Sequence, residues 1–315
     1  MSKTKCASIR KTSIGGQALI EGIMMMGPDK IATVLLKKDG SHVVRERNYV
    51  SPKKKCFLWG LPLIRGIVSY GSSISRGVSE LMFAADNAEI EDTEPSKFDK
   101  WIEKKFGMEK AQKFLMGFAV VLGIAFPIAL FILLPALVAG VFDFFGDMPL
   151  LRSIFEGMLR MVIFISFIYL TSLPKDMRRV YGFHGAEHKT IYCYESGEEL
   201  TVENVRKHSR RHPRCGTSFL FIIIIISILI FSFIGVSNIW LRLLFRLLLL
   251  PLVCGISYEL LKLAGRYDNW FTKALRAPGV AMQTITTKEP DDQMIETAID
   301  ALKRVIPGDK GADNW

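Results

Sequence analysis

Long apolar runs recur along the chain after about its first third. Four of them are nearly uncharged, and they cover residues 115–142, 154–173, 219–236 and 239–258. Because a helix needs about 20 mostly apolar residues to cross the hydrocarbon core of a bilayer, the pattern predicts four transmembrane helices. The few arginines inside these runs, Arg160, Arg242 and Arg246, must pair or reach the membrane interface.

The pattern near the N-terminus predicts a small β element. Residues 31–36 and 41–49 are β-prone and flank the pair Asp39-Gly40, and Asp-Gly between two such runs is a hairpin signal. The element is expected within residues 16–50. The predicted fold class is therefore mainly α: a polytopic membrane protein with about four transmembrane helices and a small N-terminal β element.

Two further segments have helical spacing. Apolar positions recur between residues 61 and 82, with serines and Arg76 on the alternate face. This spacing predicts a helix that either lies in the membrane interface or packs on the hairpin. A second amphipathic helix is expected from residue 291 to 305.

Basic residues indicate the orientation of the spans. The chain of 315 residues has 41 Lys and Arg against 31 Asp and Glu, a net charge of +10. Residues 1–113 hold 20 of the basic residues, 173–217 hold 9 and 258–315 hold 8, whereas 143–153 hold only Arg152. Positively charged loops stay in the cytoplasm, so both termini and the loop between the second and third spans are expected there.

This topology predicts five successive regions. They are a cytoplasmic N-terminal region at 1–113 (a β-hairpin plus amphipathic helices), transmembrane helices at 114–173, a cytoplasmic His-rich metal loop at 174–216, transmembrane helices at 217–261 and a cytoplasmic tail at 262–315. Membrane lipid is the expected partner. Nucleic acid is not, because neither a basic stripe with stacking aromatics nor a known module is found. The 5 scattered cysteines do not predict a disulfide framework in a reducing compartment.

The motif His-x-x-Glu-His at residues 184–188 carries the candidate chemistry. In a helix, His184 and His188 project from one face and Glu187 lies beside them. This is the reverse order of the zinc-protease helix, in which two histidines bind zinc and the glutamate acts as a base. We therefore expect a divalent metal ion, zinc, at His184 and His188, with Glu187 as the catalytic base or as a residue that orients a metal ligand.

A second pair, His212 and Cys215, follows the motif after a short loop. Two close ligand pairs are a common way to build a tetrahedral zinc site. Four protein ligands would close that site, whereas catalysis needs three and an open position. Glu259, at the inner end of the fourth run, is a further candidate ligand, because a glutamate at the edge of an apolar helix is costly to leave unpaired. Glu195, in the same loop as the motif, is another candidate for the third ligand, and Glu21 is a weaker one.

Several segments carry a family resemblance. Residues 15–25 (GGQALIEGIMM), 183–190 (FHGAEHKT), 212–219 (HPRCGTSF), 277–279 (APG) and 287–290 (TKEP) resemble the YqhQ family of bacterial membrane proteins. The resemblance spans nearly the whole chain. It implies a multi-pass protein of the bacterial cytoplasmic membrane and a metal-dependent enzyme whose reaction is unassigned.

Two hypotheses of different class follow. The first is a metal-dependent, hydrolytic enzyme at the cytoplasmic membrane face, with His184, His188 and one or more of His212, Cys215 and Glu259 as ligands. The second is a non-enzymatic membrane assembly or scaffold protein whose loop is folded by a closed metal site. A transporter is disfavoured, because the spans carry few polar residues and no repeated halves.

Overall fold

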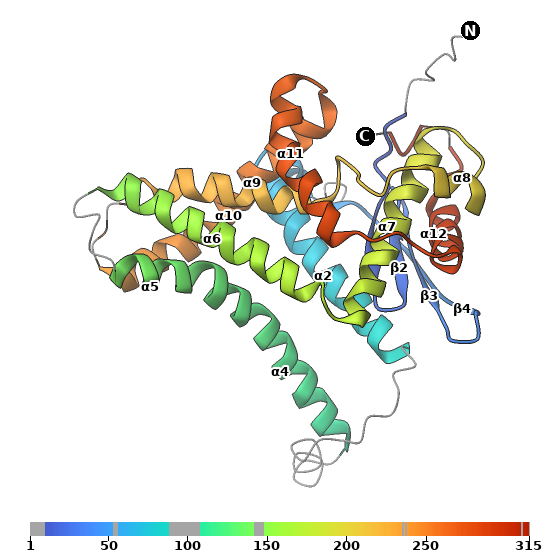
Figure 1. Ribbon diagram of the computed structural model, residues 1–315, viewed down its shortest axis with the longest axis horizontal. Coiled ribbons are helices and arrows are strands. Elements are labelled where there is room, and N and C mark those ends of the chain that lie inside the picture. Colours follow the sequence, from blue (N-terminus) through green and yellow to red (C-terminus); the bar gives the residue numbers. More distant parts are fainter. Residues whose placement is uncertain are drawn as a thin grey trace. The chain divides into compact units, whose positions relative to one another are not determined.

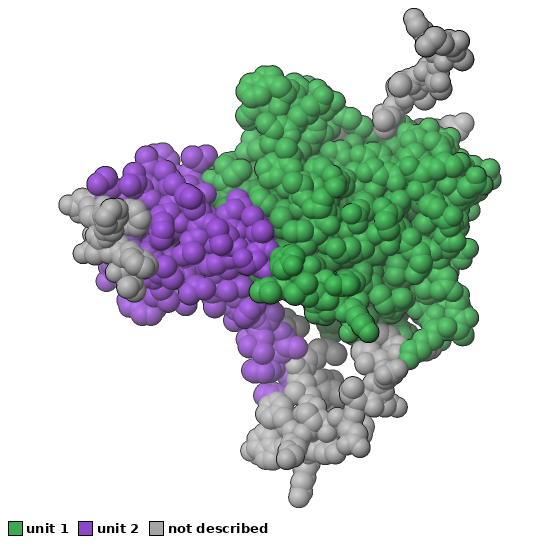
Figure 2. Space-filling model, viewed as in Figure 1, with its two compact units in different colours: residues 1–88, 167–227, 249–315 green, residues 89–166, 228–248 purple. Residues whose placement is uncertain are grey.

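The computed structural model describes residues 10–52, 56–87, 108–141, 148–234, 236, 238–309 and 311–314. The chain forms two compact units (Figure 2): unit 1 comprises residues 1–88, 167–227 and 249–315, and unit 2 comprises residues 89–166 and 228–248. The architecture is mainly helical with a small N-terminal sheet, as the sequence predicts.

The N-terminal element is an antiparallel meander of four strands. In sheet order these are β1 (Gly15–Leu19), β2 (Gly22–Met26), β3 (Lys30–Leu36) and β4 (His42–Asn48). Strands β3 and β4 turn through Gly40, whose φ of 83° is a left-handed conformation that glycine adopts without steric cost. The predicted hairpin at Asp39-Gly40 is confirmed.

Both faces of the sheet are covered by helices of unit 1. On one face, α7 (Lys175–Glu195) and α12 (Asp292–Val305) pack on alternate residues of β2 and β3 around a core that includes Met25 and Phe183 (Figure 1). On the other face, α2 (Ile64–Asn87) contributes Ala84 to a smaller core with Met24. Both methionines are buried in these cores, so the methionine run serves packing.

The two predicted amphipathic helices are confirmed, and α2 packs on the sheet. The side chain of Glu80, which is 1% exposed, accepts hydrogen bonds from Thr33 Oγ1 at 2.8 Å and from Arg45 Nη2 at 3.0 Å on the strands. Helix α12 begins after Asp291, whose carboxylate accepts from the Met294 amide at 2.9 Å and so caps the helix.

The remaining helices include the membrane-span candidates. Their bounds are η1 (Phe57–Gly60), α4 (Met108–Ile128), the π-helical segment η2 (Ala129–Leu133), α5 (Leu134–Val141), α6 (Pro149–Thr171), α8 (Val202–Lys207), α9 (Gly216–Phe231), α10 (Ile239–Arg266) and α11 (Trp270–Thr286). Pro127 lies inside α4 and removes a backbone donor just before the π-helical segment, which accounts for the irregular geometry there.

Three helical stretches are long and apolar enough to cross a membrane: Gly117–Gly140, Leu150–Thr171 and Trp240–Arg266. The third predicted run forms α9, which has only 16 residues. At about 1.5 Å per residue this helix is about 24 Å long, shorter than a hydrocarbon core of about 30 Å. Membrane helices are thus supported, and the predicted number of four spans is not confirmed.

Candidate metal centre

Helix α7 carries the His-x-x-Glu-His motif, so the segment predicted as a His-rich loop is largely helical. The helix starts after Pro174, which has an extended backbone, and Asp176 lies in its first turn, where a negative charge is favourable. One side of α7 buries Phe183, Ala186 and Ile191 against the sheet and α12. The histidines project from another side, as the helical spacing predicts.

Two histidines and one cysteine converge at this side of α7. The ligand atoms of His184, His188 and Cys215 all lie within 4.8 Å of one another. His184 Nε2 is 3.3 Å from Cys215 Sγ, and the two imidazole rings are 4.4 Å apart between centroids. A tetrahedral zinc ion would place a nitrogen and a sulfur ligand about 3.6 Å apart, close to the observed spacing.

Backbone carbonyl groups orient both imidazole rings by contacts at their Nδ1 atoms. His184 Nδ1 lies 2.8 Å from the Thr286 carbonyl oxygen, and His188 Nδ1 lies 2.6 Å from that of Arg210. A carbonyl oxygen only accepts, so each Nδ1 carries the proton. Each Nε2 then lies on the side of Cys215, where it can bind a metal ion once it carries no proton, and His188 Nε2 is buried without a hydrogen-bond partner among the described residues. Histidines that bind metals are oriented in the same way.

The three groups also perturb one another electrostatically. Burial disfavours the thiolate of Cys215, but the adjacent imidazoles of His184 and His188 outweigh burial and hold its pKa well below the usual range. Burial likewise disfavours a charged His184, yet Cys215 and Glu187 raise its pKa to about 9. A deprotonated sulfur is the form that binds metal.

Glu187 lies beside the cluster and is held by the N-terminal sheet. Its Oε1 accepts a hydrogen bond from the amide of Gly16 in β1 at 3.0 Å. A Cβ at position 16 would lie 2.9 Å from the Glu187 carboxyl carbon, so glycine permits this approach. Burial raises the pKa of Glu187. The glycine-rich segment of the sequence thus positions the predicted base.

The segment after α11 contacts α7 just as closely. An added Cβ at Gly185 would collide with the carbonyl oxygen of Lys288, whose amide donates to the Tyr181 carbonyl at 2.8 Å. One turn further on, Lys189 Nζ lies 2.8 Å from a carboxylate oxygen of Glu289. The Thr-Lys-Glu-Pro segment at 287–290 therefore forms one wall of the site.

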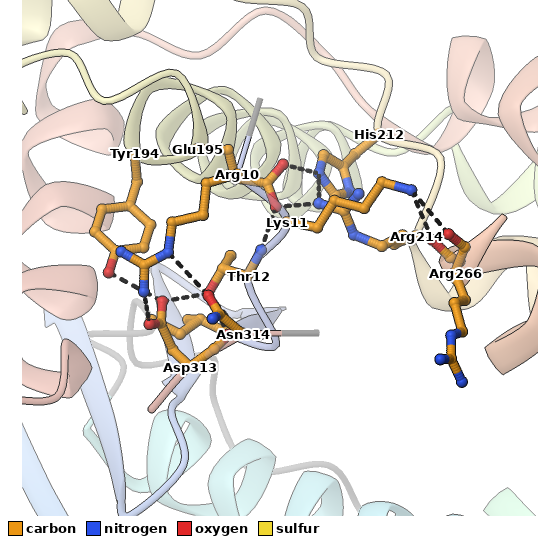
Figure 3. A network of polar contacts seen from close by, with 12 residues as sticks. Arg10, Lys11, Thr12, Tyr194, Glu195, His212, Arg214, Arg266, Asp313 and Asn314 are labelled. Atoms are coloured by element: carbon orange, nitrogen blue, oxygen red, sulfur yellow. Dashed lines mark hydrogen bonds and ion pairs between the residues drawn. The ribbon is translucent and has the colours of Figure 1, made fainter. Parts of the chain in front are cut away.

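His212 lies next to the cluster but faces another partner. Its ring is 5.7 Å from that of His188 between centroids, and its Nε2 is 3.4 Å from Glu195 Oε2. Glu195 also pairs with Arg214 and accepts from the Thr12 amide at 2.8 Å (Figure 3). The predicted set of four ligands is therefore not formed, because a carboxylate holds the His212 imidazole.

Gln283 fixes the backbone of His212. Its Oε1 accepts from the His212 amide at 2.7 Å, and its Nε2 donates to the His212 carbonyl at 2.9 Å. Gln283 is completely buried. This role could not be predicted from the sequence, since a single glutamine in an amphipathic helix is also typical of a surface position.

The structure does not bring Glu259 to the cluster. Its carboxylate accepts from Arg65 Nε at 2.7 Å and from the Leu63 amide at 3.3 Å. The Arg65 guanidinium on α2 thus balances the negative charge of Glu259, which was predicted to bind the metal ion. Glu21 is similarly paired with Arg179, whose Nε lies 2.6 Å from its carboxylate.

The fold and the site define a class of protein. Its helices include stretches apolar and long enough to cross a membrane, and it has a largely buried cluster of two histidines and one cysteine. The family model described as "Protein of unknown function (DUF1385)" matches residues 61–307. The chain is 31% identical over 299 residues to the uncharacterized protein YqhQ of Bacillus subtilis (strain 168), which covers 93% of this chain and 92% of that protein. The chain therefore belongs to the DUF1385 family, and the predicted resemblance is confirmed. No solved structure matches it.

Proposed function

We propose that this protein is a metal-dependent integral membrane enzyme, with zinc as the metal and hydrolysis as the reaction. The observation that carries the proposal is the convergence of His184, His188 and Cys215, with both imidazoles oriented by carbonyl oxygens. We further propose that the site faces the cytoplasm in the bacterial cytoplasmic membrane, with both termini on that side, because the basic segments can then all lie there.

The donor set fits an open metal site. Two imidazole nitrogens and one thiolate are ligands that zinc prefers, and three protein ligands leave the fourth position for water or substrate. His212, the candidate for closing the site, has its Nε2 at 3.4 Å from Glu195 instead. When bound, zinc would supply a nucleophile at neutral pH by lowering the pKa of a water molecule to about 7.

Glu187 is suited to move the proton in such a reaction. Burial raises the pKa of its carboxyl group, and this brings the group closer to the operating pH, where a general base is most effective. The Gly16 amide holds one carboxylate oxygen at 3.0 Å and so limits rotation of the side chain. We assign Glu187 the role of accepting a proton from the attacking water and returning it to the leaving group.

A structural metal site in an assembly or scaffold protein is the second candidate. One observation favours it: the His212 ring lies 5.7 Å from that of His188, near enough to replace water as a fourth ligand after a side-chain rotation. In that case Glu187 would have no proton to move.

Metal analysis of the full-length protein, purified in detergent, tests the metal site. We expect about one equivalent of zinc per chain, and we expect His188→Ala and Cys215→Ser to lose most of it. His42→Ala is the matched control, because His42 pairs with Asp300 and Thr297 and lies outside the cluster. A wild-type protein that binds no divalent metal would refute the proposal.

Glu187→Gln separates the two candidates. It should keep the zinc content and lower turnover by about 10²–10⁴-fold on whichever of the peptide, lipid-headgroup or phosphoester probes the wild type hydrolyses. Unchanged turnover in this variant would exclude Glu187 as the base. Zinc content that depends on His212, with no hydrolysis of any probe, would favour the scaffold.

A further inference from the structure

Unit 2 buries an unusual concentration of arginine. Arg152 and Arg160 lie on α6, and Arg242 and Arg246 lie on the first part of α10. Arg242 and Arg246 are only 5% and 2% exposed. Both helices contain stretches long and apolar enough to cross a membrane. Charged side chains in such helices are costly and mark functional sites.

The positive charge of this arginine cluster exceeds its negative charge. Glu156, which is 1% exposed, is the only carboxylate in the described residues of 148–166 and 228–248. It pairs with Arg246 and lies 3.9 Å from Arg152 Nε. The guanidinium groups of Arg152, Arg242 and Arg246 thus share one carboxylate among these residues, and arginine cannot lose its charge by deprotonation.

Several donors of the cluster are buried without a hydrogen-bond partner among the described residues. They are the Nε groups of Arg152 and Arg242, and both Nε and Nη1 of Arg246. Both carboxylate oxygens of Glu156 are also buried without a hydrogen-bond partner among these residues. The Arg246 guanidinium lies 5.4 Å from the ring centroid of Phe231, which restricts its orientation. A donor of a buried charge that has no acceptor destabilises the fold, because it has lost its hydration without gaining a partner. An acceptor with negative charge would remove this cost.

We propose that the arginine cluster binds the phosphate group of an anionic ligand. Phosphate offers several oxygens to the planar N–H fork of arginine, and it carries enough negative charge to balance the excess. Arg152 and Arg242 each lie in the first turn of their helices, where backbone amides and the helix dipole also favour an anion. The phosphate could come from a lipid headgroup or from free phosphate, and the chemistry of recognition is the same.

Binding of two phosphate-bearing probes to the full-length protein, purified in detergent and stripped of lipid, tests the proposal. One arm measures inorganic phosphate by equilibrium dialysis with labelled phosphate. The other adds phosphatidylglycerol to delipidated protein and counts retained lipid by native mass spectrometry. We expect about one equivalent of at least one of these probes. Binding of both indicates a site open to free phosphate, whereas retention of the lipid alone assigns a headgroup.

Variants then locate the site. Arg246→Gln should weaken binding by about tenfold or more, because it removes a charge-assisted pair. Glu156→Gln should strengthen binding, because it removes the competing carboxylate. Arg304→Gln is the matched control, since Arg304 is a surface arginine of α12 paired with Glu46 and Asp300. If Arg246→Gln does not fold, the increase expected for Glu156→Gln still tests the proposal.

Absence of binding in both arms would overturn the proposal. Equal binding by the wild type and Glu156→Gln would also overturn it, because the carboxylate at the centre of the cluster must compete with any anion bound there.

Discussion

The metal-ligand cluster on α7 and the arginine cluster of unit 2 both bury charge, but they balance it differently. Around His184, His188 and Cys215, each imidazole has a carbonyl partner and the thiolate faces both imidazoles. Around Glu156, donors of Arg242 and Arg246 are buried without a hydrogen-bond partner among the described residues. The first cluster is a preorganised set of ligands, and the second is a set of donors that a ligand would complete.

Buried polar groups in the two clusters obtain their hydrogen-bond partners in different ways. Segments distant in sequence, such as β1 and the turn after α11, satisfy the first cluster through close backbone approach. In the second cluster, backbone carbonyl groups satisfy only some of the donors: Arg152 Nη2 donates to the Ala139 carbonyl at 3.1 Å and Arg160 Nε to that of Phe131 at 2.7 Å. This difference can be tested by substitutions that remove a backbone contact or a charge partner from the well-paired groups of unit 1.

Gly185→Ala should have the largest effect. The new methyl group would collide with the Lys288 carbonyl oxygen, and backbone atoms on both sides cannot move away without separating α7 from the segment after α11. We expect a loss of stability of about 4 kcal/mol or more, seen as loss of monodisperse protein in detergent and of bound zinc. Gly71→Ala is the control, because nothing lies within 4 Å of its added Cβ, and it should stabilise α2 by about 0.5–1 kcal/mol. Equal behaviour of the two variants would contradict the close approach.

Glu195→Gln should have the next largest effect. It would leave Arg214, whose side chain is only 7% exposed, without its carboxylate. This would create in unit 1 a buried arginine with an unsatisfied donor, as Arg242 and Arg246 have in unit 2 among the described residues. Breaking a buried pair costs about 3–5 kcal/mol. Glu203→Gln is the matched control: Glu203 and its partner Lys207 are 85% and 60% exposed, so the loss of this carboxylate should cost about 1 kcal/mol or less. Thermal unfolding at pH 7 gives both values.

The stabilisation of the fold by ionised Glu195 should decrease as the pH falls. Burial opposes ionisation of this carboxyl group, but His212, Arg214 and the Thr12 amide outweigh burial and lower its pKa. A lowered pKa stabilises the fold above the unfolded-state value of about 4.3, and that stabilisation is lost as the pH falls through the folded-state value. The difference between wild type and Glu195→Gln should therefore shrink in acid. A constant difference down to pH 3 would contradict this assignment.

Features that depend on local spacing could be predicted from the sequence. The hairpin at Asp39-Gly40, the amphipathic helix that ends at Val305 and the common face of His184 and His188 all follow from periods of two or 3.6 residues. The proximity of Cys215 to the motif was also foreseen, because ligand pairs of this kind recur in zinc sites. Each of these predictions uses either the spacing of residues within one segment or the chemical type of the residues.

Features that depend on pairing between distant segments could not be predicted. The contact of Gly16 with Glu187 joins residues far apart in the chain. The histidines contact the backbone carbonyl groups of Thr286 and Arg210, and every residue type has such a group, so the sequence does not indicate which ones are used. Glu259 was expected at the cluster because topology brought it to the same membrane face. Its pairing with Arg65 depends on how α2 packs on α10, which periodicity does not encode.

The smallest effect concerns the reactivity of two cysteines in the same unit. Interaction with His184 and His188 lowers the pKa of Cys215 despite burial, whereas burial raises the pKa of Cys193 to about 11. In protein stripped of metal, alkylation of Cys215 by iodoacetamide should therefore be nearly independent of pH between 7 and 9, because the thiolate already predominates. Alkylation of Cys193 should rise about tenfold for each pH unit, since its thiolate fraction does so below its pKa.

The pH profile of each cysteine is compared only with itself, so differences in access of the reagent do not affect the result. His184→Asn should restore a pH-dependent profile at Cys215, because it removes the nearest positive charge. Added zinc should protect Cys215 and leave Cys193 unchanged. A Cys215 profile that rises with pH like that of Cys193 would mean that the imidazoles do not stabilise the thiolate, and the metal-ligand cluster would then lack the charge balance that distinguishes it from the arginine cluster.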